Sequence, residues 1–133
     1  MGKILKNNEL DYYKKNGFLF PLKVMSKKKA KYYREKLEKY EKNLGKPISG
    51  NERHKAHLLF TWINALVRNP LILDAVEDII GPNILCWSSN FFIKEANDNT
   101  FVSWHQDFTY WGLHPENVIT AWLALSDASS NTG

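Results

Sequence analysis

The sequence predicts an α+β fold, with helices in roughly the first 82 residues and antiparallel strands in the remainder. Two observations support this division. Apolar residues recur at helical spacing as far as residue 80, and from residue 84 they alternate at a spacing of two. Gly81 and Pro82, a strong helix-terminating pair, separate the two patterns. We therefore expect one domain over residues 1–133, with a helical part at 1–82 and strands at 83–133.

The N-terminal stretch predicts one short helix and one short strand. Asn8 is a suitable N-cap for a helix over residues 9–15, and Gly17 would end that helix because glycine tolerates the left-handed conformation. The apolar run at 18–22 then reads as a strand. Its Pro21 cannot donate a backbone hydrogen bond, which favours an edge position.

A lysine-rich helix is predicted over residues 27–44, with Ser26 as its N-cap and Gly45 as its stop. Most of the excess positive charge lies at 23–46. A basic face of this kind is compatible with nucleic-acid binding. Glutamates interrupt the patch and no recognition motif accompanies it, so we interpret it as the solvated face of an amphipathic helix.

Two further helices precede the change of pattern. Apolar side chains at helical spacing mark the first of them over residues 59–67. Asn69 is the N-cap of the second, and Pro70 stands at its first position, where the missing proline N–H is not needed. This second helix would run as far as Gly81.

Three strands are predicted after residue 82, at 84–95, 101–105 and 118–126, with a polar turn at 96–100 joining the first two as a hairpin. The first strand has one apolar face and one mixed face, which suits a barrel wall that is covered by helices on one side and borders a cavity on the other. On this interpretation four side chains are buried in the core: Trp62, Cys86, Trp87 and Trp104.

The motif with most chemical content is His105-x-Asp107. In a strand the two side chains point to the same side, roughly 6.5 Å apart along the strand at about 3.3 Å per residue. An imidazole and a carboxylate so placed can share one metal ion, and this mixed nitrogen/oxygen pair suits Fe(II), Mn(II) or Zn(II). Gln106 would point away. Because His-x-Asp is common by chance, an exposed strand end with a capping aspartate is the alternative.

Composition bounds the class of protein. With 133 residues, 44% hydrophobic and 14% aromatic, the chain can form a packed core. Its single cysteine, Cys86, excludes an intramolecular disulfide and fits a reducing compartment. No apolar run has the length of a signal peptide or of a membrane span. We therefore expect a cytoplasmic protein that binds neither membranes nor nucleic acids.

The order and spacing of several motifs together resemble the phytanoyl-CoA dioxygenase family. The motifs are Asn16-Gly17-Phe18, residues 70–76, Gly81-Pro82-Asn83-Ile84, Phe91-Phe92-Ile93-Lys94, Trp104-His105-Gln106-Asp107, Tyr110-Trp111, Pro115 and Thr120-Ala121-Trp122. The resemblance covers nearly the whole chain, but only about the first half of a typical family member. It implies that the strands begin a double-stranded β-helix, or jelly roll, of the cupin-like kind, and that the chain is the N-terminal part of a truncated oxygenase.

The resemblance also implies a reaction and a set of site residues. The family uses Fe(II) and 2-oxoglutarate, which is decarboxylated to succinate with O2 while an aliphatic carbon of a small-molecule or acyl substrate is hydroxylated. His105 and Asp107 would be iron ligands. Three residues match contacts to 2-oxoglutarate: Asn90, Trp122 and, by a less certain alignment, Lys55. Tyr110 and Trp111 would line the substrate entrance.

The chain departs from the family pattern after residue 130. The family requires a second histidine ligand and an arginine that binds the 2-oxoglutarate carboxylate, both on later strands. His114 lies in an aromatic loop and is a poor substitute. The main alternative is therefore a catalytically incomplete fragment or binding module, and we expect the 133-residue chain alone to be inactive. A halogenase is a weaker alternative, because that branch replaces the carboxylate ligand and Asp107 is present.

Overall fold

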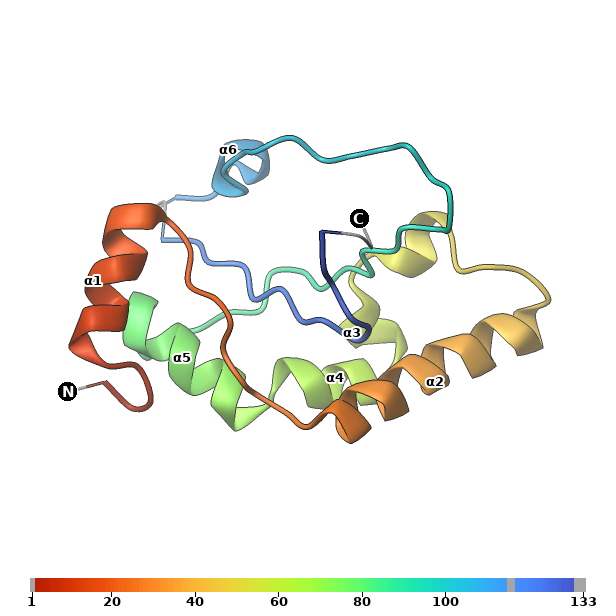
Figure 1. Ribbon diagram of the computed structural model, residues 1–133, viewed down its shortest axis with the longest axis horizontal. Coiled ribbons are helices and arrows are strands. Elements are labelled where there is room, and N and C mark those ends of the chain that lie inside the picture. The colour runs from red at the N-terminus through yellow and green to blue at the C-terminus, as the bar shows by residue number, and fades with distance from the viewer. Residues whose placement is uncertain (1, 115–116, 131–133) are drawn as a thin grey trace.

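The computed structural model of the chain describes residues 2–114 and 117–130. Within this part of the chain every regular element is helical (Figure 1). The elements are α1 (Asn7–Asn16), α2 (Lys27–Leu44), the 3-10 helix η1 (Gly50–Arg53), α3 (Ala56–Leu59), α4 (Thr61–Val67), α5 (Pro70–Ile80) and α6 (Phe108–Trp111).

The helix predictions with clear capping residues are confirmed. The Ser26 hydroxyl accepts a hydrogen bond from the Lys29 backbone N–H at 3.2 Å, and α2 ends where Gly45 adopts a left-handed φ of 73°. The Asn69 side chain likewise accepts a hydrogen bond from the Leu71 N–H at 3.0 Å at the start of α5. These caps satisfy backbone groups that a helix end otherwise leaves unpaired.

Two helix boundaries differ from prediction. The N-cap of α1 is Lys6 rather than Asn8, because the Glu9 carboxylate accepts the Lys6 backbone N–H at 2.8 Å and so fixes an earlier start. The helix predicted at 59–67 is divided at Phe60, whose extended backbone (φ −120°, ψ 118°) separates α3 from α4.

The predicted α+β class and its incomplete jelly roll are wrong for the described residues. The segments at 18–22, 84–95, 101–105 and 118–126 run as irregular chain between and above the helices (Figure 1). A strand exists only where a neighbour completes its ladder of hydrogen bonds.

The backbone of segment 84–95 forms its hydrogen bonds with the chain around η1 and α3. The Ala56 N–H donates to the Ser89 carbonyl, and the Phe91 N–H donates to the Arg53 carbonyl, each at 2.9 Å. A turn does form within 96–100, where the Asp98 N–H donates to the Glu95 carbonyl at 3.2 Å. The segments on either side of this turn nevertheless do not pair, so local alternation alone did not determine the fold.

Helices α2, α3 and α4 surround the main buried cluster, formed by Tyr33, Ala56, Ile63 and Leu66. Phe91, Leu123 and Leu125 pack against this cluster, so the irregular segments 84–95 and 118–126 are both fixed to the helical layer. Trp62 also packs there, which agrees with its predicted core position.

Three other residues predicted to be buried are exposed. Trp104 is 96% exposed, Trp87 is 42% exposed, and Cys86 is also at the surface. All three predictions depended on a sheet whose apolar face is covered by helices. Because the described segments form no such sheet, alternate residues acquire no common buried side.

The N-terminal segment is held against α5 by one carboxylate. Asp78 accepts hydrogen bonds from three consecutive backbone N–H groups, those of Lys3 at 2.5 Å, Ile4 at 2.9 Å and Leu5 at 2.8 Å. Leu5 is thereby held in a buried position, 3% exposed. Burial raises the pKa of Asp78, but the three N–H donors outweigh it and leave the pKa below its ordinary value.

We expect Asp78→Ala to lower the free energy of unfolding by about 1–2 kcal/mol, because three backbone donors lose their acceptor. In the wild type this stabilisation is fully present above the unfolded-state pKa of about 3.9 and is lost as the pH falls through the lower folded-state pKa. Amide hydrogen exchange at Leu5 measures the effect. Asp11→Ala, an exposed change on α1, is the matched control, and equal protection of Leu5 in both variants would contradict the prediction.

None of the helices in residues 2–114 and 117–130 combines the length and the apolar character needed to cross a membrane.

Candidate functional site

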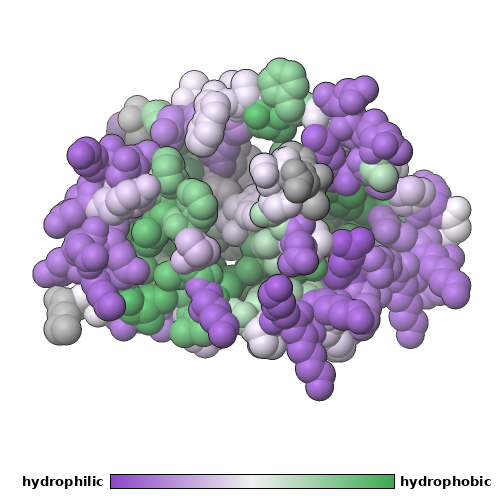
Figure 2. All heavy atoms as spheres, in the orientation of Figure 1, coloured by the Kyte–Doolittle hydropathy of each residue, from purple (hydrophilic) through white to green (hydrophobic). Residues whose placement is uncertain are grey.

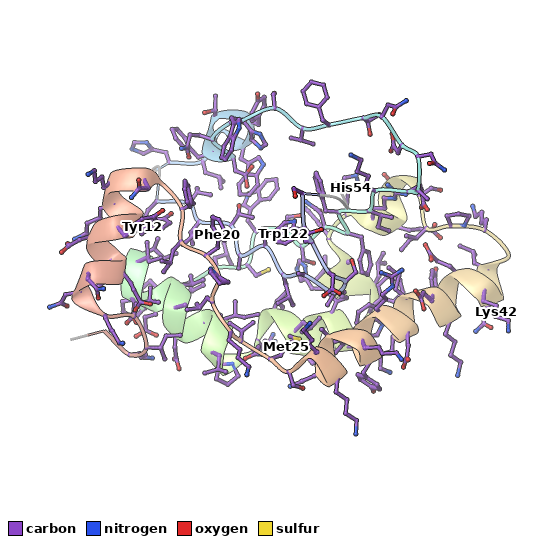
Figure 3. All side chains as sticks on the ribbon, in the orientation of Figure 1. Tyr12, Phe20, Met25, Lys42, His54 and Trp122 are labelled. Atoms are coloured by element: carbon purple, nitrogen blue, oxygen red, sulfur yellow. The ribbon has the colours of Figure 1, made fainter. Side chains whose placement is uncertain are left out.

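A cavity of about 1240 Å³ opens between α5, the segment at 17–27 and the segment at 118–128. Apolar side chains of α5, such as Ile72 and Val76, form part of its wall. On the face shown in Figure 2, apolar residues gather between hydrophilic residues of α1 and α2. Trp122 and Phe20 both line the cavity, and Lys42, near the end of α2, lies far from them (Figure 3).

His105 and Asp107 lie on the wall of this cavity and contact each other directly. The His105 Nε2 is 2.9 Å from the Asp107 Oδ1. The other carboxylate oxygen of Asp107, Oδ2, accepts a short hydrogen bond from the Thr120 hydroxyl. The side chains of His105 and Asp107 are 34% and 31% exposed, so the pair is accessible from solvent.

The His105 ring is fixed at both nitrogens. Its Nδ1 is 2.7 Å from the Ser103 carbonyl, which can only accept, so Nδ1 carries a proton and donates. The hydrogen bond to Ser103, followed by that to Asp107, raises the pKa of His105. Because Nδ1 donates to Ser103, Nε2 is the ring nitrogen that faces the Asp107 carboxylate. A cation could bind Nε2 after Nε2 loses its proton.

The donor chemistry of this pair fits Fe(II) in part. An imidazole nitrogen and a carboxylate oxygen belong to the mixed donor set that non-haem iron takes. The pair offers two such donor atoms, the Nε2 of His105 and the Oδ1 of Asp107. Among the residues that the structure describes, no cluster of three or more His, Cys, Asp or Glu side chains could hold a metal ion.

A second, smaller hollow lies elsewhere and is lined by Asn51, His54, Lys55, Trp87, Ser88, Asn90 and Trp111. The rings of Trp87 and Trp111 stack in parallel, 5.3 Å between centroids and 3° between planes. The Lys55 ammonium lies 5.5 Å from the centroid of the Trp87 ring, within cation–π range. The Asn90 side-chain oxygen accepts a hydrogen bond from the Ser88 hydroxyl at 3.0 Å.

The structure therefore distributes the predicted site residues over two hollows. The larger one brings together His105, Asp107 and Trp122, and the smaller one brings together Lys55, Asn90 and Trp111. Tyr110 lies beside His105, since its ring packs edge-on against the imidazole with 5.7 Å between centroids.

Sequence reasoning missed two residues of the larger cavity. Thr120 contacts Asp107 from 13 positions away, and its sequence signal was its place in the Thr120-Ala121-Trp122 motif, to which no role was assigned. Gln106 also lines the cavity, although strand alternation predicted that it would point away. The described chain at this point is irregular, so the alternation does not apply.

Comparison with known proteins gives one family and two relatives. The family match covers residues 13–133 and is described as phytanoyl-CoA dioxygenase. A probable alpha-ketoglutarate-dependent hypophosphite dioxygenase of Stutzerimonas stutzeri is 30% identical over 77 residues, 58% of this chain and 27% of the relative. The L-proline trans-4-hydroxylase of Streptomyces griseoviridis is 25% identical over 72 residues, 51% of this chain and 27% of the relative.

These matches span little more than a quarter of the length of either relative. No solved structure matches the chain.

Proposed function

The chain belongs to the phytanoyl-CoA dioxygenase family, and from this premise we propose that it acts as a dioxygenase dependent on Fe(II) and 2-oxoglutarate. The reaction would hydroxylate an aliphatic carbon of a small-molecule or acyl substrate with O2. Iron and 2-oxoglutarate are the reagents that members of this family use. Bound iron supplies the capacity to activate O2, which protein side chains lack.

One observation carries the proposal: His105 and Asp107 contact each other on the wall of a large, mainly apolar cavity. The Nε2 of His105 and the Oδ1 of Asp107 would be the metal-binding atoms. An apolar cavity beside the pair suits an organic substrate, because such sites bury most of their ligand and use few polar groups to orient it.

The remaining site residues have proposed roles in binding rather than in chemistry. Trp122, on the same cavity, would contact 2-oxoglutarate beside the metal. Lys55 and Asn90 offer an ammonium and an amide that can donate to a carboxylate, but they line the smaller hollow and not the cavity of His105 and Asp107, so we do not place them beside the metal. Tyr110 would shield His105 and Asp107 from one side, and Trp111, whose ring stacks on Trp87, would line the substrate entrance.

A catalytically incomplete binding module is the second candidate, and the donor inventory favours it. The facial triad requires three ligands, whereas among the described residues no group of three or more His, Cys, Asp or Glu side chains could hold a metal ion. The Nε of each arginine is engaged locally: Arg34 with Glu38 at 2.7 Å, Arg53 with the Ile48 carbonyl at 2.8 Å, and Arg68 with Asn64 at 3.0 Å. Halogenation is disfavoured by the presence of Asp107.

Succinate formation from 2-oxoglutarate separates the two candidates. The chain, extended by the later strands that carry the second histidine and the arginine of the family pattern, is incubated with 2-oxoglutarate, O2 and ascorbate, with and without Fe(II), and succinate is quantified. We expect succinate that requires added iron and disappears with a chelator. Metal binding without any succinate would overturn the enzymatic proposal and support the binding module.

A further inference from the structure

The two oxygens of the Asp107 carboxylate are in different environments. Oδ1 is 2.9 Å from the His105 Nε2, whereas Oδ2 accepts the Thr120 hydroxyl. A carboxylate can bind a metal through one oxygen or through both, and the choice changes how many positions remain on the metal. An O–H donor on one oxygen favours binding through the other, because the engaged lone pair is no longer available.

Thr120 is well placed to impose this choice. It lies on the segment at 118–126, which is anchored to the buried cluster by Leu123 and Leu125. Asp107 precedes α6 but makes no side-chain cap for that helix, and its two carboxylate oxygens contact His105 and Thr120 instead. The hydrogen bond therefore links the loop that carries the metal pair to the chain segment that packs on the helical layer.

The other potential metal ligand is fixed in the same way. The Nδ1 of His105 donates to the Ser103 carbonyl at 2.7 Å, which sets the ring orientation and directs Nε2 toward Asp107. Each member of the pair is thus held by one outer contact, His105 by a backbone carbonyl and Asp107 by a side chain. Only the second contact can be removed by substitution.

We propose that Thr120 is a positioning residue that directs the Oδ1 of Asp107, rather than both oxygens, toward a divalent cation shared with His105. This inference rests on the proposed function, since it assumes that the pair binds metal. It adds a residue outside the ligand set, with a role that depends on its hydroxyl group and not on its size.

Mn(II) binding measured by electron paramagnetic resonance tests the inference without turnover, because free and bound Mn(II) give distinguishable signals. Thr120→Val keeps the shape of the side chain and removes the donor, and Thr120→Ser restores the donor. We expect Thr120→Val to weaken Mn(II) binding by about 10-fold to 100-fold, the usual effect of losing an outer-shell partner. Thr120→Ser should stay within about 3-fold of the wild type, and Thr61→Val, a matched change at an exposed position of α4, should have no effect.

The outcomes separate the inference from the function beneath it. Wild-type affinity in Thr120→Val, with circular dichroism showing a folded chain, would overturn the positioning role and leave the proposed function in place. Equal losses in Thr120→Val and Thr120→Ser would also overturn it, because the hydroxyl would then not be the active feature. An absence of Mn(II) binding in the wild type would overturn both the inference and the proposed function.

Discussion

Replacing His105 or Asp107 by alanine should weaken Mn(II) or Fe(II) binding by about 100-fold or more. Each substitution removes a proposed ligand atom. Loss of a residue that only contacts a ligand already lowers metal affinity by about 10-fold to 100-fold. The two proposed ligand atoms are 2.9 Å apart, and losing one would leave a single monodentate group, which holds a divalent cation poorly. Titration of the protein with metal, followed by calorimetry, measures the loss.

Two matched variants control for this prediction. His114→Ala removes an exposed imidazole, and Asp11→Ala removes an exposed carboxylate on α1; neither residue lines the cavity. Both should bind metal like the wild type. If His105→Ala and His114→Ala lose affinity to the same extent, the binding measured is nonspecific and the pair is not a metal site.

Leu66→Ala should lower the free energy of unfolding by about 3 kcal/mol. Leu66 is 6% exposed in the cluster between α2, α3 and α4, and truncating a buried leucine removes transfer free energy and leaves a cavity. The free energy of unfolding of domains of this size is about 5–15 kcal/mol, so a loss of this size is a large fraction of the total stability. Urea denaturation followed by tryptophan fluorescence measures it.

The control for Leu66 is chemically identical. Leu58, on α3, is 71% exposed, so Leu58→Ala should change stability by less than about 0.5 kcal/mol. A Leu66→Ala variant as stable as Leu58→Ala would show that the cluster described here does not stabilise the chain.

The helices could be predicted because their limits are local. The cap at Ser26 and the left-handed turn at Gly45 lie next to the helix they delimit, and Asn69 does the same for α5. Strands could not be predicted in this way, because a strand also needs a neighbouring strand. Alternation of apolar and polar residues does not show whether such a neighbour exists. Segment 84–95 forms backbone hydrogen bonds with Arg53 and Ala56, and no pattern in the sequence predicts this pairing.

The site was predictable to a similar degree. His105 and Asp107 are two positions apart, so their proximity follows from short-range geometry even though the supposed strand is irregular. The contact between Thr120 and Asp107 could not be predicted from the sequence, because it depends on how segment 118–126 packs on the helices. Lys55 and Asn90 line a different hollow from His105 and Asp107, which is likewise a property of the tertiary arrangement. Their roles in binding 2-oxoglutarate stay predictions.

The exposed apolar side chains of the irregular segments have a consequence for the colloidal behaviour of the protein. Leu85, Phe101 and Trp104 are 84%, 85% and 96% exposed, on chain whose backbone groups are not enclosed in a ladder. Extended segments with unpaired backbone groups can form hydrogen bonds with extended segments of other molecules, including copies of the same protein. We therefore expect the exposed apolar side chains to favour self-association at high protein concentration, which the net charge of +4 opposes.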